Sequence, residues 1–135
     1  MALQLSTAVR NAMLDAIETA IGTTAVLKIR TGAAPASAAA ADSGTVLATL
    51  TLPSDWMAAA SSGSKAKSGT WADTSADAAG TAAHYRIYAS DGTTCHLQGT
   101  VTATGGGGDM VVDNAVFAAG QSFTITSYSW TAPNA

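Results

Sequence analysis

Hydrophobic residues recur every four positions near the start of the chain and predict one amphipathic helix. From Ser6 or Thr7, either of which is a suitable N-cap, the pattern runs to residue 21 and stops at Gly22, a residue favoured just after a helix. The apolar stripe consists of Val9, Met13, Ile17 and Ile21. We expect this stripe to pack over a face or an end of the chain's own domain, with docking onto a neighbouring subunit as the alternative.

After the helix the hydrophobic period changes to two, which is typical of half-buried strands. Pro53 ends one of these strands, and the segment from 54 to 72 is expected to hold two short strands around Gly63, with Trp56 and Met57 as core anchors. Residues 31–44 are expected to form a loop of small side chains. The other expected strands cover residues 25–30, 45–52, 82–89, 95–103, 110–112 and 123–130, the last with a β-bulge near Ser127.

The dipeptide Asp91-Gly92 predicts a hairpin turn between the strands at 82–89 and 95–103. A loop with an odd number of residues, most simply 91–93, keeps the two inward-facing sets on one face. In that register the expected cross-strand pairs are His84 with Thr100 and His96 with Tyr88, and both histidines face outward.

These elements predict a mostly β protein in a single domain, residues 1–135, with one N-terminal helix at about 6–21. Helix and strand do not alternate along the chain, so a doubly wound fold is excluded. About eight short strands with turns between them indicate a jelly roll or β-sandwich, which we expect to be antiparallel.

Composition and charge exclude several classes of function. The chain has 135 residues, a net charge of −3 and only six Lys and Arg, which form no basic stripe, so direct nucleic-acid binding is not expected. The single cysteine, Cys95, has no partner for an internal disulfide. No apolar run is long enough to span a membrane, and the residues from Met1 onward do not resemble a signal peptide.

The residues that usually carry chemistry are present without the spacing that chemistry needs. The two histidines are expected about 14 Å apart along the hairpin, which is too far for a shared metal. Most aspartates lie in expected turns, where they usually bond their own backbone. Trp56 and Trp71 are expected in the core rather than on a carbohydrate-binding surface. We therefore expect no catalytic residue, no bound metal and no cofactor.

Charged residues make up only 11% of the chain, against about 25% in ordinary soluble domains. Ala, Ser, Thr and Gly take their place. Such side chains lose little entropy when they are immobilised, so they suit surfaces that become contacts with other subunits. The composition alone also fits an ordinary β-rich protein.

The chain resembles capsid cement, or decoration, proteins of tailed bacteriophages, in particular of short-tailed phages like those that infect Bordetella. The resemblance covers nearly the full length. It lies in the N-terminal helix (Leu5 to Ile21), LKIRTGAAPASAAAADSGTVLATLTL (27–52), the segment from Trp56, GTAAHYRIY (80–88) and GQSFTITSYSWT (120–131).

The resemblance implies a jelly roll that sits on the outside of the capsid as a homo-oligomer, a dimer rather than a trimer, and clamps adjacent major capsid subunits. It implies synthesis in the host cytoplasm and no catalysis. Bridging subunits would stabilise the shell against the pressure of the packaged genome. We expect the N-terminal segment or the loop at 31–44 to supply part of the contact.

Two other functions fit the sequence. The chain could be a tail or head–tail connector protein, or a carbohydrate-binding module that attaches virions to surfaces, in which case Trp130 is the candidate aromatic residue.

Overall fold

The computed structural model describes residues 3–133 and shows one helix followed by short strands. The helix is α1 (Thr7–Ile21). The strands are β1 (Val26–Arg30), β2 (Val46–Thr51), β3 (Ser64–Ala66), β4 (Ala72–Asp73), β5 (Gly80–Thr81), β6 (His84–Tyr88), β7 (Cys95–Ala103), β8 (Met110–Val112), β9 (Val116–Phe117) and β10 (Phe123–Thr131). The expected mostly β class with an N-terminal helix is confirmed.

The ends of α1 are set by the residues that the sequence indicated. The Ser6 side chain caps the first turn by accepting a hydrogen bond from the Val9 N–H at 3.3 Å. At the other end Gly22 has φ +93°, and its N–H donates to the Glu18 carbonyl. A side chain at that φ would be strained, so glycine ends the helix cleanly.

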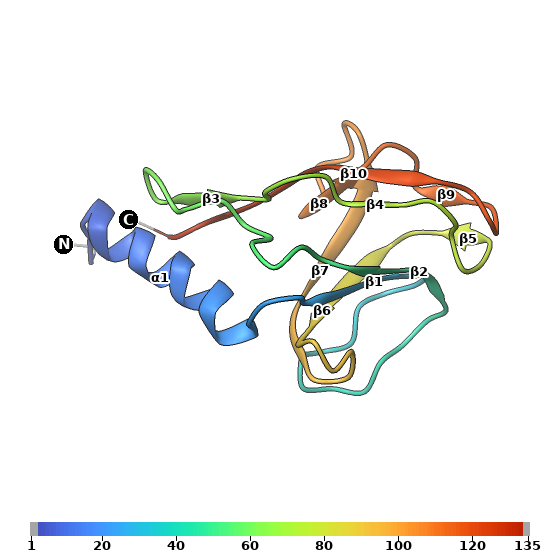
Figure 1. Ribbon diagram of the computed structural model, residues 1–135, viewed down its shortest axis with the longest axis horizontal. Coiled ribbons are helices and arrows are strands. Elements are labelled where there is room, and N and C mark those ends of the chain that lie inside the picture. The colour runs from blue at the N-terminus through green and yellow to red at the C-terminus, as the bar shows by residue number, and fades with distance from the viewer. Residues whose placement is uncertain (1–2, 134–135) are drawn as a thin grey trace.

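Eight strands form one large sheet, in which the order β2-β1-β6-β7-β8-β10-β3 is continuous and β4 pairs separately with β10. Figure 1 shows β1, β2 and β6 in one layer and β3, β4, β8 and β10 in another, with β7 running between the layers. Strands β5 and β9 form a small second sheet. The expected all-antiparallel arrangement is not observed, because β7 and β8 pair in parallel.

In the hairpin between β6 and β7, the expected cross-strand register is reached with a different loop. His84 lies opposite Thr100 as predicted, but Tyr88 lies opposite Cys95, and His96 is the extra residue of a β-bulge. The loop is closed by the Ala89 N–H, which donates to the Thr94 carbonyl. The loop therefore has an even number of residues, which by itself would place the inward-facing residues of the two strands on opposite faces. The extra residue in the bulge brings them back to the same face.

The apolar side chains between the layers form one core cluster that includes Leu27, Ile29, Leu50, Ile87, Val101 and Ile125. Trp56 and Trp71 are fully buried in it, as predicted, with ring centroids 6.0 Å apart. The expected bulge near Ser127 is also present, between Ile125 and Ser127 in the pairing of β10 with β8.

Candidate interaction surfaces

The polar side of α1 faces the rest of the molecule. The Arg10 guanidinium donates to the Ala132 carbonyl oxygen, with Nη2 to O at 2.9 Å, and the Asn11 side chain accepts from the Gly63 N–H at 2.8 Å. Gly63 has φ +73°, which residues with a side chain rarely adopt, and a Cβ atom there would displace the Arg10 guanidinium. The helix is therefore held to the loop before β3 by polar contacts.

Lys65 on β3 completes this attachment. Its side chain is only 3% exposed, and Nζ lies 2.7 Å from Asp15 Oδ1 and 2.8 Å from Glu18 Oε2. Burial alone would lower the pKa of Lys65, but hydrogen bonds to the two carboxylates outweigh it and raise the pKa. The hydrogen bond from Lys65 and one from the Ala60 N–H lower the pKa of Asp15. Lys65 and Asp15 therefore stay charged together, and the contacts of Lys65 with Asp15 and Glu18 fix α1 against β3.

The apolar stripe of α1 is buried only toward its C-terminal end, so the predicted packing is wrong for the first half of the helix. Ile21 is buried and Ile17 packs against the core, but Val9 and Met13 are 47% and 43% exposed. The side chain that the helix buries most deeply is Leu14, which the stripe did not include. Lys65 on β3 and the backbone N–H groups of Ala60 and Gly63 before it offer this part of α1 a cation and hydrogen-bond donors rather than an apolar surface.

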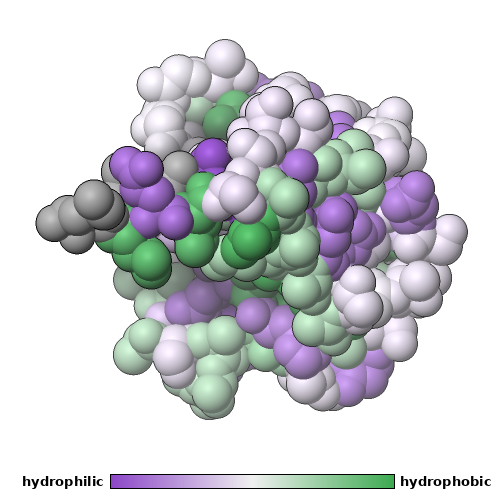
Figure 2. Space-filling model, turned by 90° about the vertical axis from the view of Figure 1, so that its left-hand side faces the viewer, coloured by the Kyte–Doolittle hydropathy of each residue, from purple (hydrophilic) through white to green (hydrophobic). Residues whose placement is uncertain are grey.

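A groove with a volume of about 690 Å³ lies beside the exposed stripe, between α1 and the ends of β7 and β10. Its lining is mainly apolar and includes Met13, Ile17, Leu97, Trp130 and Pro133. Figure 2 looks onto this end of the molecule and shows strongly hydrophobic side chains gathered beside a hollow. We call the exposed stripe (Val9, Met13) and the groove together the α1 face.

Several polar side chains that line the groove already have hydrogen-bond partners, although Gln98 Oε1 is buried without one. The Tyr85 and Tyr128 hydroxyls are 2.9 Å apart, and Trp130 Nε1 donates to the Tyr128 hydroxyl at 2.7 Å. The Asp109 carboxylate accepts from the backbone and the hydroxyl of Thr100. A ligand that bonds these groups would have to break the existing bonds, so the part of the groove around Tyr128 and Trp130 is suited to an apolar occupant.

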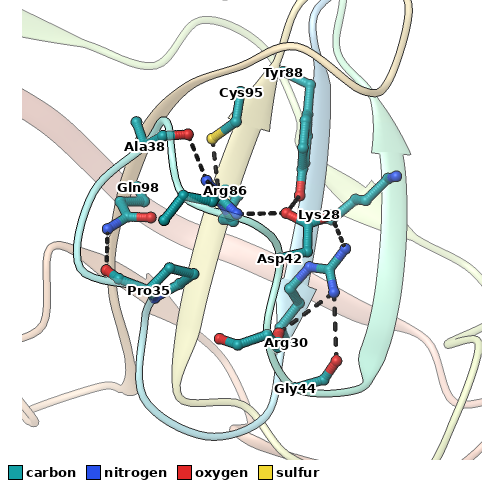
Figure 3. Close-up of polar contacts among 12 residues, drawn as sticks. Lys28, Arg30, Pro35, Ala38, Asp42, Gly44, Arg86, Tyr88, Cys95 and Gln98 are labelled. Atoms are coloured by element: carbon teal, nitrogen blue, oxygen red, sulfur yellow. Dashed lines mark hydrogen bonds and ion pairs between the residues drawn. The ribbon is translucent and has the colours of Figure 1, made fainter.

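The second surface is the loop at 31–44, which is bound to the outer face of the sheet by a cluster of charges (Figure 3). Asp42 accepts from Arg30 Nη2 at 2.7 Å, from the Tyr88 hydroxyl at 2.7 Å and from Arg86 Nη1. Arg30 and Arg86 are buried under the loop, while Asp42 is 39% exposed at its edge.

Further hydrogen bonds hold the loop along its length. Arg86 donates to the carbonyl oxygens of Ala38 and Ala40, and the Gln98 amide donates to that of Pro35 at 2.6 Å. His84 Nδ1 lies 2.7 Å from the Gly32 carbonyl oxygen. These residues come from β6 and β7, so the sheet determines the shape of the loop.

The charges in this cluster reinforce one another. Burial by itself raises the pKa of Asp42, but the Tyr88 hydrogen bond and the positive charges of Arg30 and Arg86 outweigh it, so the pKa lies below the ordinary value. Burial, and then the hydrogen bond to the Asp42 carboxylate, raise the pKa of Tyr88 to about 12. Asp42 therefore remains ionised, and Tyr88 remains a hydrogen-bond donor, across the neutral range.

The loop presents small side chains to solvent. Ala33, Ala36, Ser37, Ala39 and Ala41 are exposed, while the backbone beneath them is tied down. A partner that binds this surface orders few side chains and no free backbone, which reduces the entropic cost of association.

The predicted chemistry-bearing residues are not brought together. His84 is buried beneath the loop, contrary to its expected outward position, whereas His96 is exposed on the bulge. Among residues 3–133, no three His, Cys, Asp or Glu side chains are grouped to hold a metal ion. Asp73 and Asp91 bond nearby backbone N–H groups as expected of turn aspartates, but Asp42 does not behave in this way.

Sequence reasoning missed the charge cluster because the loop that buries it has no hydrophobic signal. Arg30 and Arg86 occupy strand positions that alternate with core residues, which predicts exposure to solvent. The one available signal was that two of the few arginines, Arg30 and Arg86, lie on the same face of two strands, β1 and β6, that pair with each other.

Within the described part of the chain, no helix is both long enough and apolar enough to cross a membrane. Comparisons with protein-family models, with curated proteins and with solved structures found no significant match to this chain.

Proposed function

We propose that the chain is a virion structural protein that binds the outside of a phage capsid and clamps adjacent major capsid subunits. The observation that carries this proposal is the loop at 31–44. Three strands contribute side chains, two of them buried arginines, to hold a surface made of small residues. That arrangement supplies a pre-ordered contact surface.

The mechanism follows from linkage. A protein that contacts two capsid subunits at once loses part of its contact area when they separate, so it binds the assembled shell more tightly than free subunits. Preferential binding to the assembled state stabilises that state. Many copies would therefore help the shell to resist the pressure of a packaged genome. We also propose that the fold is a jelly roll, as the resemblance to cement proteins implies.

Two rival functions have less support. A tail or head–tail connector protein would use the same kind of rigid surface, and no feature of the described residues favours it over the capsid. A carbohydrate-binding module would need polar groups free to bond a sugar, but Trp130 and the tyrosines beside it bond one another. Trp56 and Trp71 are buried and do not form a platform.

Cryo-electron microscopy of virions from the phage that encodes the chain tests the location. We expect many copies distributed over the icosahedral shell, with the loop at 31–44 in contact with capsid subunits. A few copies confined to the tail or portal would contradict the proposal and support the connector function.

Binding of the purified chain to shells that lack it tests the loop itself. Asp42→Ala frees the loop and leaves its exposed small residues unchanged, and we expect at least about tenfold weaker binding because the loop must then be ordered on association. Asp55→Asn, in an exposed segment outside the cluster, is the matched control. Equal binding by the two variants would contradict the proposal that the loop is part of the capsid contact.

A further inference from the structure

Strand β7 has a neighbouring strand along only part of one side. It pairs with β6 from Cys95 to Thr100, whereas β8 pairs with its other side only at Val101–Ala103. Because β8 begins at Met110, that other side of β7 has no strand beside it before Val101 among residues 3–133. An open strand edge offers its backbone N–H and C=O groups to another chain.

The backbone of Gln98 points toward this open side. The Thr100 N–H does so too, because it donates to the Asp109 carboxylate at 2.9 Å, whereas the Val101 N–H donates to the Ala83 carbonyl on the β6 side. Backbone groups alternate in direction along a strand, so the N–H and C=O of Gln98 point the same way as those of Thr100. Within the described part of the chain these two groups have no strand to bond.

The two strands at the ends of the large sheet, β2 and β3, are partly covered. The Asp77 N–H donates to the Leu47 carbonyl on β2 at 2.7 Å, and the Ala58 N–H donates to the Ala66 carbonyl on β3 at 2.8 Å. Natural β proteins commonly protect their edges by such coverage. The open side of β7 is an exception, so it is a place where a further strand can pair.

This open edge forms one wall of the groove in the α1 face. Leu97 and Gln98 line the groove together with Met13 on α1 and Trp130 on β10. The Gln98 side chain is engaged elsewhere, because its amide donates to the Pro35 carbonyl oxygen (Figure 3). The groove therefore combines backbone groups of a strand edge with the apolar side chains seen in Figure 2. That combination fits an extended peptide with apolar residues at alternate positions.

One charge in the groove indicates the charge of such a peptide. Asp109 is the one charged residue among the described residues that line the groove, and Thr100 donates to its Oδ2 through both the N–H and the hydroxyl. These hydrogen bonds lower the pKa of Asp109, so its carboxylate is ionised at neutral pH. Oδ1 has no hydrogen-bond donor among residues 3–133, so it can accept from a cation.

We propose that the groove binds an extended peptide segment of a partner protein, which adds a strand to the open edge of β7 beside Gln98. Its apolar side chains lie against Met13, Leu97 and Trp130, and a Lys or Arg of the segment lies against Asp109. Main-chain hydrogen bonds supply affinity, and the side-chain contacts supply specificity. This site goes beyond the capsid contact proposed above and does not depend on it.

A nuclear magnetic resonance titration with a synthetic peptide tests the site. The probe is acetyl-Lys-Val-Thr-Val-Thr-Val-Lys-amide, whose two terminal lysines allow either strand direction to place a cation beside Asp109. We expect shift changes at residues 97–100 and at the Trp130 indole. At saturation the Gln98 N–H should exchange with solvent at least about tenfold more slowly, because it then donates to the peptide.

Two substitutions at one position isolate the backbone contact. Gln98→Pro removes the N–H that would bond the peptide, and proline is tolerated where the N–H of an edge strand faces outward. Gln98→Ala loses the same side chain but keeps the N–H. We expect the peptide to bind at least about tenfold more weakly to Gln98→Pro than to Gln98→Ala. Circular dichroism and thermal melting of both variants verify the fold.

Asp109→Asn tests the charge and keeps an oxygen that can accept from Thr100. We expect about two- to fivefold weaker peptide binding at low salt and a smaller difference at high salt, as for an exposed ion pair. Asp55→Asn, outside the groove, is the matched control and should bind the peptide like the unmodified chain. Equal binding by these two variants at low salt would contradict the charged contact.

Four results would overturn the strand site: no shift change with the peptide, binding that leaves exchange of the Gln98 N–H unchanged, equal binding by Gln98→Pro and Gln98→Ala, or a Gln98 N–H already protected in the free chain. The last result would mean that the chain itself or a second copy covers the edge. A chain that binds the peptide but not capsid shells would contradict only the capsid function. A chain that binds shells but not the peptide would contradict only the strand site.

Discussion

At the scale of single residues, the Asp42 carboxylate joins the loop at 31–44 to side chains of β1 and β6. Among residues 3–133 it is the one acidic partner of two buried arginines, and it also accepts from Tyr88. A single side chain therefore neutralises much of the positive charge beneath the loop at 31–44. Removing it leaves guanidinium groups that are buried and only partly bonded.

We expect Asp42→Ala to lower the free energy of unfolding by about 2–4 kcal/mol, measured by urea denaturation near neutral pH, because buried charges lose their partner. Asp55→Asn should change it by less than about 0.5 kcal/mol, as is usual for exposed substitutions. The effect should depend on pH. The pKa of Asp42 is lowered from 3.8 in the folded chain, so its contribution is present above that value and is lost as the pH falls through the folded pKa. A deficit that stays constant from neutral pH to about pH 2 would contradict this account.

At the scale of elements, α1 is attached through charge as well as through the buried C-terminal end of its apolar stripe. Lys65 joins β3 to two consecutive turns of the helix by way of Asp15 and Glu18. Most amphipathic helices of this length bury their apolar side and leave charges in water. Here ion pairs help to hold the helix, while Val9 and Met13 on its apolar side remain exposed.

We expect Lys65→Ala to destabilise the chain by about 2–4 kcal/mol, because Glu18 is then left partly buried without its cation. Hydrogen exchange should show faster opening of α1 than of β6 in this variant. Lys67→Ala, two residues away, removes a lysine that bonds only the Gly69 carbonyl at the surface. That control should leave helix exchange unchanged, and equal effects of the two substitutions would contradict the role of Lys65.

At the scale of the whole molecule, the two layers meet at a buried pair of tyrosines. The hydroxyls of Tyr85 on β6 and Tyr128 on β10 bond each other, and the rings are in edge contact with centroids 5.3 Å apart. Gly99 allows this approach, because a Cβ atom there would lie 2.7 Å from atoms of the Tyr85 ring. Burial raises the pKa of Tyr85 to about 12 and also raises the pKa of Tyr128.

Alkaline pH should therefore separate the layers. In the unfolded chain Tyr85 ionises near 10.0, whereas in the folded chain its pKa is about 12, so the stability that it contributes is full below the first value and falls as the pH rises toward the second. Urea denaturation between about pH 9 and pH 12 should show this fall. Tyr85→Phe should make the unfolding free energy fall less steeply with pH over this range. Tyr88 also contributes through its raised pKa, so Tyr88→Phe is the comparison variant, and no change of slope in Tyr85→Phe would contradict the assignment.

The local pattern of the chain was sufficient to predict α1, the strands around Leu27, Leu50 and Ile87, and the burial of Trp56 and Trp71. Each of these depends on nearby residues: a cap, a hydrophobic period, or a large apolar side chain with few competitors for the core. The parity change near Ser127 predicted its bulge for the same reason.

Only the tertiary structure decided which surfaces are covered. The periodicity of α1 identifies an apolar side but not what faces it, and Lys65, fifty residues away from Asp15, turned that side outward. The parity of β6 assigns His84 and Arg86 to a polar face, but the loop at 31–44 buries that face by binding Asp42 to arginines on two strands. Long-range ion pairs leave no periodic trace in a sequence, so both candidate interaction surfaces became visible only when the chain was folded.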